Sequence, residues 1–103
     1  MKIESVRQQY GSDFKTAWLN AMYTDVYEYS GKYSNLDALS RFIEYLKFYD
    51  EATDYMEVEG MIQDLHEIWY DFDIETLTEE DAGVYVDRVI QMAEANGAEI
   101  QIW

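Results

Sequence analysis

Apolar residues recur every three or four positions over much of the chain, which is the spacing of a helix with one buried face. A first such segment follows Ser12, a good N-cap residue, and Gly31 is expected to end it. A second segment begins at Ser34 or Asn35. The apolar positions of the two segments are Phe14, Ala17, Trp18, Ala21, Met22 and Tyr29, then Leu36, Leu39, Phe42, Ile43, Leu46 and Tyr49. The pattern predicts two amphipathic helices.

The second half of the chain carries two further helical patterns. Residues 53–71 predict a third helix, with Gly60 inside it as the place of a kink, a break or a close helix contact. After a short loop, Thr78 is the expected N-cap of a fourth helix, and Asn96 and Gly97 are expected to end it.

The two ends of the chain show a different pattern. Met1–Val6 alternates weakly, and Ala98–Trp103 alternates with its two isoleucines on one face. We therefore expect a mainly α, four-helix single domain over residues 1–103, and a short two-stranded β-piece from the termini (α+β) stays open. Such a pair of strands is marginal unless it packs on helices.

Charge divides the chain into two unequal halves. The 103 residues carry 22 acids and 7 bases, a net charge of −15. Residues 1–49 hold six acids and six bases, whereas residues 50–103 hold sixteen acids and Arg88 alone. Fourteen of these acids lie between Asp50 and Asp87, among apolar residues at helical spacing. The segment therefore has enough apolar surface to fold, unlike an acidic tail, and would hold its carboxylates in a fixed array.

This charge distribution excludes some partners and favours others. Direct binding to DNA, RNA or an anionic membrane is not expected, because phosphate contacts need Lys and Arg. A basic partner protein is expected, because the field would steer a cationic surface towards the acidic half. The chain has no Cys, no apolar run of membrane-spanning length and no apolar segment at its N-terminus. A cytoplasmic protein is the simplest interpretation, and homodimer formation stays open.

Motifs for catalysis and metal binding are incomplete. Asp71, Asp73 and Glu75 alternate as at the start of a calcium loop, but Thr76 stands where Gly is needed and Ala82 where Glu is needed. The sequence has neither a phosphate-binding glycine loop nor a nucleophile motif. We predict a protein that is not an enzyme and that uses no cofactor and no metal.

The single histidine, His66, rules out a zinc motif of two histidines, and we expect it at the edge of a helix face. Tyr is unusually frequent, with ten residues. The expected core aromatics are Trp18, Phe42, Trp69 and Tyr85. The tyrosines expected to be partly exposed, where Tyr is favoured at interfaces, are Tyr10, Tyr23, Tyr27, Tyr33, Tyr45, Tyr49 and Tyr70.

The candidate partner-binding residues are the carboxylates that fall on helical neighbours away from the apolar stripe of the third helix. Carboxylates three or four residues apart stand about 5–6 Å apart, of the same order as neighbouring phosphates in a nucleic acid strand. The expected row comprises Asp50, Asp54, Glu57, Asp64, Glu67 and Asp71, extended by Asp73 and Glu75. Glu79, Glu80 and Asp81 are weaker candidates, because the dipole of the fourth helix explains them.

These features together resemble a functional class, the small acidic DNA-mimic inhibitors of phages and mobile elements, including antirestriction and anti-CRISPR proteins. The resemblance lies in size, the all-acid block over 50–87, the many tyrosines and the lack of Cys, and not in a sequence motif. It implies an inhibitor that occupies the basic DNA- or RNA-binding groove of a nuclease or CRISPR effector, in the host cytoplasm if phage-encoded.

Two local segments are similar to barstar, the acidic ribonuclease inhibitor. They are Asn35–Leu39 after Tyr33, and Ala93–Ile100. The part between them departs, because barstar has a central strand where this chain shows an acidic helical pattern, and Arg41 stands where a functional acid is expected. A barstar-like ribonuclease inhibitor is therefore one alternative. The other is a partner-binding or regulatory protein that uses an aromatic or helical interface.

Overall fold

The computed structural model describes residues 14–52 and 60–100, which form four helices. These are α2 (Phe14–Lys32), α3 (Asn35–Ala52), α4 (Gly60–Tyr70) and α5 (Glu79–Ala95). The prediction of a mainly α chain with four helices is confirmed for the residues that the structure describes. The described residues contain no strand. The predicted β-piece falls mostly outside them, and its described part, residues 98–100, forms no strand.

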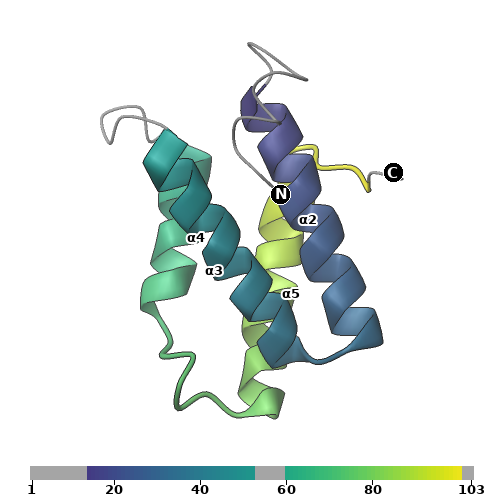
Figure 1. The fold of residues 1–103 in the computed structure, drawn as a ribbon, viewed down its shortest axis with the longest axis vertical. Coiled ribbons are helices and arrows are strands. Elements are labelled where there is room, and N and C mark those ends of the chain that lie inside the picture. The colour runs from purple at the N-terminus through teal and green to yellow at the C-terminus, as the bar shows by residue number, and fades with distance from the viewer. Residues whose placement is uncertain (1–13, 53–59, 101–103) are drawn as a thin grey trace.

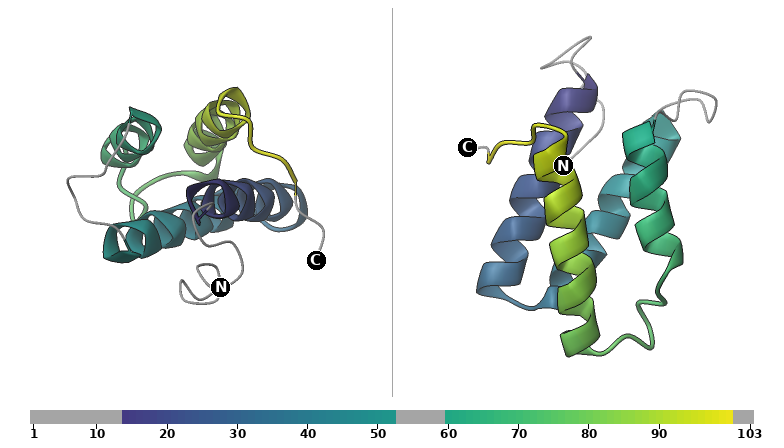
Figure 2. Two further views of the ribbon diagram at one scale, coloured as in Figure 1. Left: turned by 90° about the horizontal axis from the view of Figure 1, so that it is seen from above. Right: turned by 180° about the vertical axis from the view of Figure 1, so that it is seen from behind.

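Consecutive helices run antiparallel, so the four described helices alternate in direction along the chain (Figure 1). Seen from above, α2 and α3 form one layer and α4 and α5 lie over it as a second layer (Figure 2). Helix α5 packs against α2, α3 and α4. The segment after α5 returns to the first layer, where the Glu99 N–H donates to Asn20 Oδ1 at 2.9 Å.

The helix boundaries follow local chemistry with small departures from prediction. Thr78 is the N-cap of α5, and its hydroxyl accepts from the Asp81 N–H at 3.2 Å. At the other end, Gly97 has a φ of 84°. The Ala98 N–H donates to Ala93 O and the Gly97 N–H to Glu94 O, which is the Schellman motif that Gly favours.

Helix α2 continues through Gly31 to Lys32, and α3 continues past Tyr49 to Ala52. The prediction that Gly31 ends the first helix is therefore wrong by one residue, since the helix ends at Lys32. The last turn tolerates a glycine whose backbone remains helical. Of the predicted third helix, residues 53–59 lie outside the described part of the chain, and Gly60–Tyr70 is helical as predicted.

The core is made by one face of every helix. Its largest fully buried side chains in the first layer include Trp18, Met22, Phe42 and Leu46. The second layer adds Ile62, Leu65 and Ile68 from α4, then Val86, Val89 and Ala93 from α5. This burial of apolar side chains is the main force that holds the two layers together.

Of the six described tyrosines that were expected to be partly exposed, three are exposed and three are buried. Tyr27, Tyr33 and Tyr70 are exposed. Tyr23, Tyr45 and Tyr49 are buried instead, because they lie on the contact between the first-layer helices and the core. The Tyr49 ring meets the Trp18 ring edge to face at 4.9 Å, and the Trp18 indole N–H donates to Tyr45 O at 2.8 Å. Tyr10 lies outside the described residues. Trp69 and Tyr85, expected in the core, are only partly buried at its edge.

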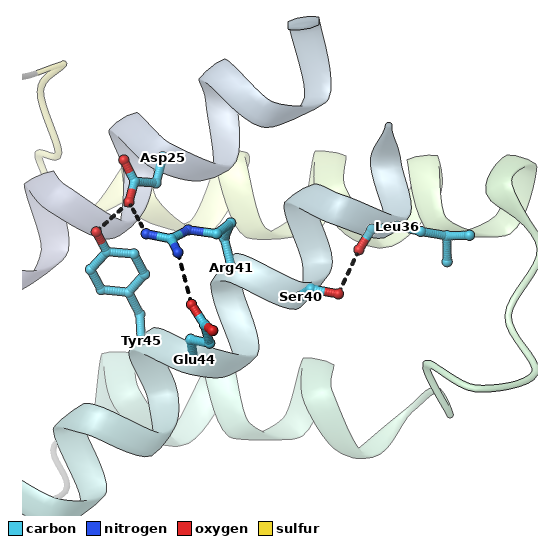
Figure 3. A network of polar contacts seen from close by, with 6 residues as sticks. All are labelled: Asp25, Leu36, Ser40, Arg41, Glu44 and Tyr45. Atoms are coloured by element: carbon cyan, nitrogen blue, oxygen red, sulfur yellow. Dashed lines mark hydrogen bonds and ion pairs between the residues drawn. The ribbon is translucent and has the colours of Figure 1, made fainter. Parts of the chain in front are cut away.

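A polar network ties α2 to α3 (Figure 3). The Asp25 carboxylate of α2 accepts from Arg41 Nη2 at 2.9 Å and from the Tyr45 hydroxyl, both on α3. Arg41 Nη1 also donates to Glu44 at 2.9 Å, and its guanidinium lies over the Tyr29 ring. The hydrogen bond that Arg41 donates to Asp25 raises the pKa of Arg41. Burial, followed by the bond to Asp25, raises the pKa of Tyr45.

Candidate functional site

Every carboxylate between Gly60 and Ile100 is exposed to solvent. The eleven residues are Asp64, Glu67, Asp71, Asp73, Glu75, Glu79, Glu80, Asp81, Asp87, Glu94 and Glu99, and Arg88 is the one base among them in the sequence. Most stand on α4 and α5, whose apolar faces are buried in the core. Because the helices are packed, the carboxylates are held in a fixed arrangement. We define this set as the acidic surface.

Within this surface, α4 presents a narrow stripe of three carboxylates. Asp64, Glu67 and Asp71 are separated by three and four residues, so they fall within about 60° of one another around a helix of 3.6 residues per turn. Asp64 and Glu67 are both exposed on α4, and Asp71 directly follows the helix. The Cβ atoms of neighbouring residues on such a helical stripe stand about 5–6 Å apart.

Asp71 differs from the other two because it has a cationic partner. Arg88 Nη1 of α5 donates to Asp71 Oδ2 at 2.9 Å, with both side chains about half exposed. The Tyr85 hydroxyl donates to the Asp71 backbone carbonyl at 3.2 Å, and the Arg88 guanidinium lies over the Tyr85 ring. Asp71 therefore fixes the end of α4 to α5, and its charge is partly compensated.

A groove of about 480 Å³ lies between α4 and α5 beside this pair. From α4 it is lined by Asp64, Glu67 and Ile68, and from α5 by Arg88, Gln91, Met92 and Ala95. Two of the predicted partner-binding residues thus share one concave surface. The sequence could not indicate the α5 wall, because the contact between the helices depends on their packing.

The other predicted site residues are not brought into this groove. Asp50 stands on α3, and its side chain lies outside the described part of the chain. Asp54 and Glu57 lie wholly outside it. Asp73 and Glu75 belong to the turn after α4, where Asp73 Oδ1 accepts from the Glu75 N–H at 3.0 Å. Asp73 therefore has a local structural use, as Asp commonly has in turns.

Glu79 has a role that its position in the sequence does not indicate. Its carboxylate accepts from the backbone N–H groups of Asn35 and Leu36, the latter at 3.1 Å. An acid from the first turn of α5 thereby satisfies free donors at the N-terminus of α3. The explanation by the dipole of its own helix was incomplete, because only the tertiary structure brings the two helix N-termini together.

A second stripe of carboxylates on α5 could have been found from the sequence. Glu80, Asp87 and Glu94 recur every seven residues, so they fall within about 40° of one another around the helix axis. All three are exposed. Their seven-residue spacing is the signal, and it extends the acidic surface along the outer side of α5.

The structure offers little for metal or acid–base chemistry in its described part. No group of three or more His, Asp or Glu side chains among residues 14–52 and 60–100 is placed to hold a metal ion. His66 is 8% exposed, more buried than the helix edge where it was expected. Its ring lies 5.8 Å from that of Trp69 and 6.2 Å from that of Tyr70.

Comparison with protein-family models, with curated proteins and with solved structures finds no match for this chain. Across the part of the chain that the structure describes, no helix combines the length and apolar character needed to cross a bilayer.

Proposed function

We propose that the protein is an acidic, nucleic-acid-mimicking inhibitor that occupies the basic DNA- or RNA-binding groove of a nuclease or CRISPR effector. It would act without catalysis, as an anti-defence protein of a phage or mobile element in the host cytoplasm. The single observation that carries the proposal is the acidic surface, on which all eleven described carboxylates of the second layer and its flanking loops are exposed against one arginine.

The physical argument rests on how a nucleic-acid-binding groove recognises its ligand. Such a groove uses Lys and Arg to contact phosphates, and much of its affinity comes from neutralising regularly spaced negative charges. Carboxylates on α4 and α5 supply negative charge at comparable spacing on a support that is already folded. Little conformational entropy is then lost on binding, which favours affinity.

A second candidate function rests on exposed aromatic side chains. Tyr27 and Tyr33, near the end of α2, are 50% and 67% exposed, and Tyr70 at the end of α4 is 70% exposed. Tyrosine is enriched at protein interfaces because its ring packs while its hydroxyl forms hydrogen bonds. A partner-binding protein that uses these exposed tyrosines would depend on ring contacts and only weakly on salt.

The test is capture of partners by the immobilised protein from a host-cell lysate, with duplex DNA as competitor. The proposal expects a nuclease or CRISPR effector that DNA displaces, and whose DNA cleavage the free protein inhibits. Binding should fall steeply between about 50 and 200 mM NaCl, as nucleic acid binding does. The double variant Asp64→Asn with Glu67→Gln should weaken both capture and inhibition.

The matched control removes one Asp and one Glu from the charge-balanced half of the chain, residues 1–49, as Glu28→Gln with Asp37→Asn. Both residues are exposed, on α2 and α3 respectively. Equal loss in the two double variants would mean that only net charge matters, and unchanged binding in both would sink the mimic proposal. Loss of capture in Tyr27→Ala with Tyr33→Ala, together with weak salt dependence, would support the aromatic interface instead.

A further inference from the structure

The groove between α4 and α5 combines an apolar floor with an acidic rim. Ile68 of α4 is 2% exposed and forms the floor together with the half-buried Met92 of α5. Asp64 and Glu67 stand on the α4 rim, and Gln91 and Ala95 form the facing wall. An apolar channel with anionic edges matches a side chain that has an apolar stem and a cationic head.

The charges along the groove are unequal from end to end. Within the described residues Arg88 pairs with Asp71 at one end, whereas Asp64 and Glu67 form no ion pair. Because α4 and α5 run antiparallel, Ala95 lies towards the Asp64 end and away from Arg88. The charges at the Arg88 end therefore largely offset each other, and an incoming cation is attracted to the carboxylates at the other end.

We propose that this groove receives an arginine side chain from the basic surface of the partner. Its methylene stem packs on Ile68 and Met92, its guanidinium donates to the Asp64 and Glu67 carboxylates, and the Gln91 side-chain oxygen is a further acceptor. The identity of the partner rests on the proposed function, whereas the preference of the groove for arginine rests on its own shape and charge.

Arginine fits the groove better than lysine for two physical reasons. Its guanidinium is planar with five donors, so it can bond two neighbouring carboxylates at once, whereas an ammonium acts as a point charge. It is also less strongly hydrated, so that its transfer from water to a partly apolar groove costs less. The mimic would thus bind its partner by receiving an arginine side chain in the groove, as well as through the overall electrostatic field of its acidic surface.

The test uses the full chain and two capped tripeptides, Gly-Arg-Gly and Gly-Lys-Gly, titrated by NMR. The arginine peptide is expected to shift the amide signals of residues 64–68 and 91–95, and to bind several-fold more tightly than the lysine peptide. Equal affinity of the two peptides, or shifts spread over Glu80, Asp87 and Glu94 as strongly as over the groove, would overturn the proposal.

A neutral substitution that fills the groove tests the same idea against the partner. Ala95 is exposed near the end of α5, so Ala95→Phe occupies the groove without changing any charge. It should weaken binding of the arginine peptide and of the partner by roughly tenfold, the effect of blocking an anchor position. Gln63→Phe, at an exposed position of α4 outside the groove, is the matched control and should bind as the unaltered chain does.

The two proposals fail in different ways. If a DNA-displaceable nuclease is captured but binds Ala95→Phe as tightly as the unaltered chain, the groove is not used and the mimic proposal stands. If no such nuclease is captured but the arginine peptide binds the groove and is excluded by Ala95→Phe, the mimic proposal falls and the arginine groove stands.

Discussion

The two helical layers of this protein differ in whether they take a carboxylate out of the solvent. In the layer of α2 and α3, Asp25 is nearly buried, with 16% of its side chain exposed, because Arg41 and Tyr45 donate to it. In the layer of α4 and α5, every carboxylate is exposed and Arg88 forms the only ion pair among the described residues there. The first layer holds one carboxylate inside the structure, whereas the second presents all of its described carboxylates to solvent.

The difference shows that the number of Lys and Arg residues on a pair of helices limits how many carboxylates the pair can bury. A carboxylate leaves water at an acceptable free energy only when cations or donors replace its hydration. The sequence supplies four bases to α2 and α3 but one to α4 and α5. The second layer must therefore be held by apolar contacts such as Leu65 and Val89, and its acids can only face outwards.

The largest expected effect is a loss of folding stability when one arginine is replaced in each layer. Arg41→Gln should destabilise the fold by about 2–3 kcal/mol, because Asp25 is left nearly buried without its cation. Arg88→Gln should cost less than about 1 kcal/mol, because the pair with Asp71 is half exposed. Urea denaturation of both variants measures the two values, and equal losses would contradict the contrast between the layers.

A somewhat smaller effect is expected where the layers meet. Glu79→Ala should cost about 1–2 kcal/mol, because the Asn35 and Leu36 N–H groups lose their acceptor at the start of α3. Hydrogen exchange at these two amides should accelerate together with the loss in stability. Glu80→Ala removes the neighbouring exposed acid from the same turn of α5 and is the control, for which at most a few tenths of a kcal/mol is expected.

Salt should stabilise the protein through its second layer. Raising NaCl from about 0.1 to 1 M shortens the screening length from about 10 to 3 Å, which weakens repulsion within the acidic surface. We expect Tm to rise by a few degrees, and by less in Asp87→Asn with Glu94→Gln, where part of the repulsion is already removed. Calorimetric melts check this, and a Tm that falls or stays flat would show that the carboxylates are already compensated.

The smallest effect appears only in alkaline solution and belongs to the first layer. Burial raises the pKa of Tyr45 above its ordinary value of 10.0, so the folded state holds this proton more tightly than the unfolded state. The resulting stability is fully present below pH 10 and is lost as the pH rises from there towards the higher folded-state pKa. Tm measured from pH 8 to 11 should fall less steeply in Tyr45→Phe than in the unaltered chain, and parallel curves would contradict this.

Much of the fold could be predicted from the sequence because its signals are local. Helical periodicity located all four described helices, and Thr78 and Gly97 marked the ends of α5, since capping depends on residues within one turn. The exposure of Asp64 and Glu67 also followed from the pattern, because an ionised carboxylate without a cation stays in water.

The candidate site was predicted only in part. Asp64 and Glu67 were identified as candidates, but the Arg88–Asp71 pair and the α5 wall of the groove join residues far apart in the chain. Helical spacing shows which residues share a face of one helix, and it carries no information about which face another helix covers. The buried Tyr45 was misjudged for the same reason, because its partner Asp25 lies on the preceding helix.

The sequence by itself determined where the helices lie, that the net negative charge is confined to one half, and that this half must present its acids to solvent. Only the tertiary structure decided that Glu79 caps α3, that Asp25 accepts from both Arg41 and Tyr45, and that α4 and α5 enclose a groove. The physical reason is range. Periodicity, capping and hydration act within a few residues, whereas ion pairs, cross-helix caps and grooves depend on how the packed helices bring distant residues together.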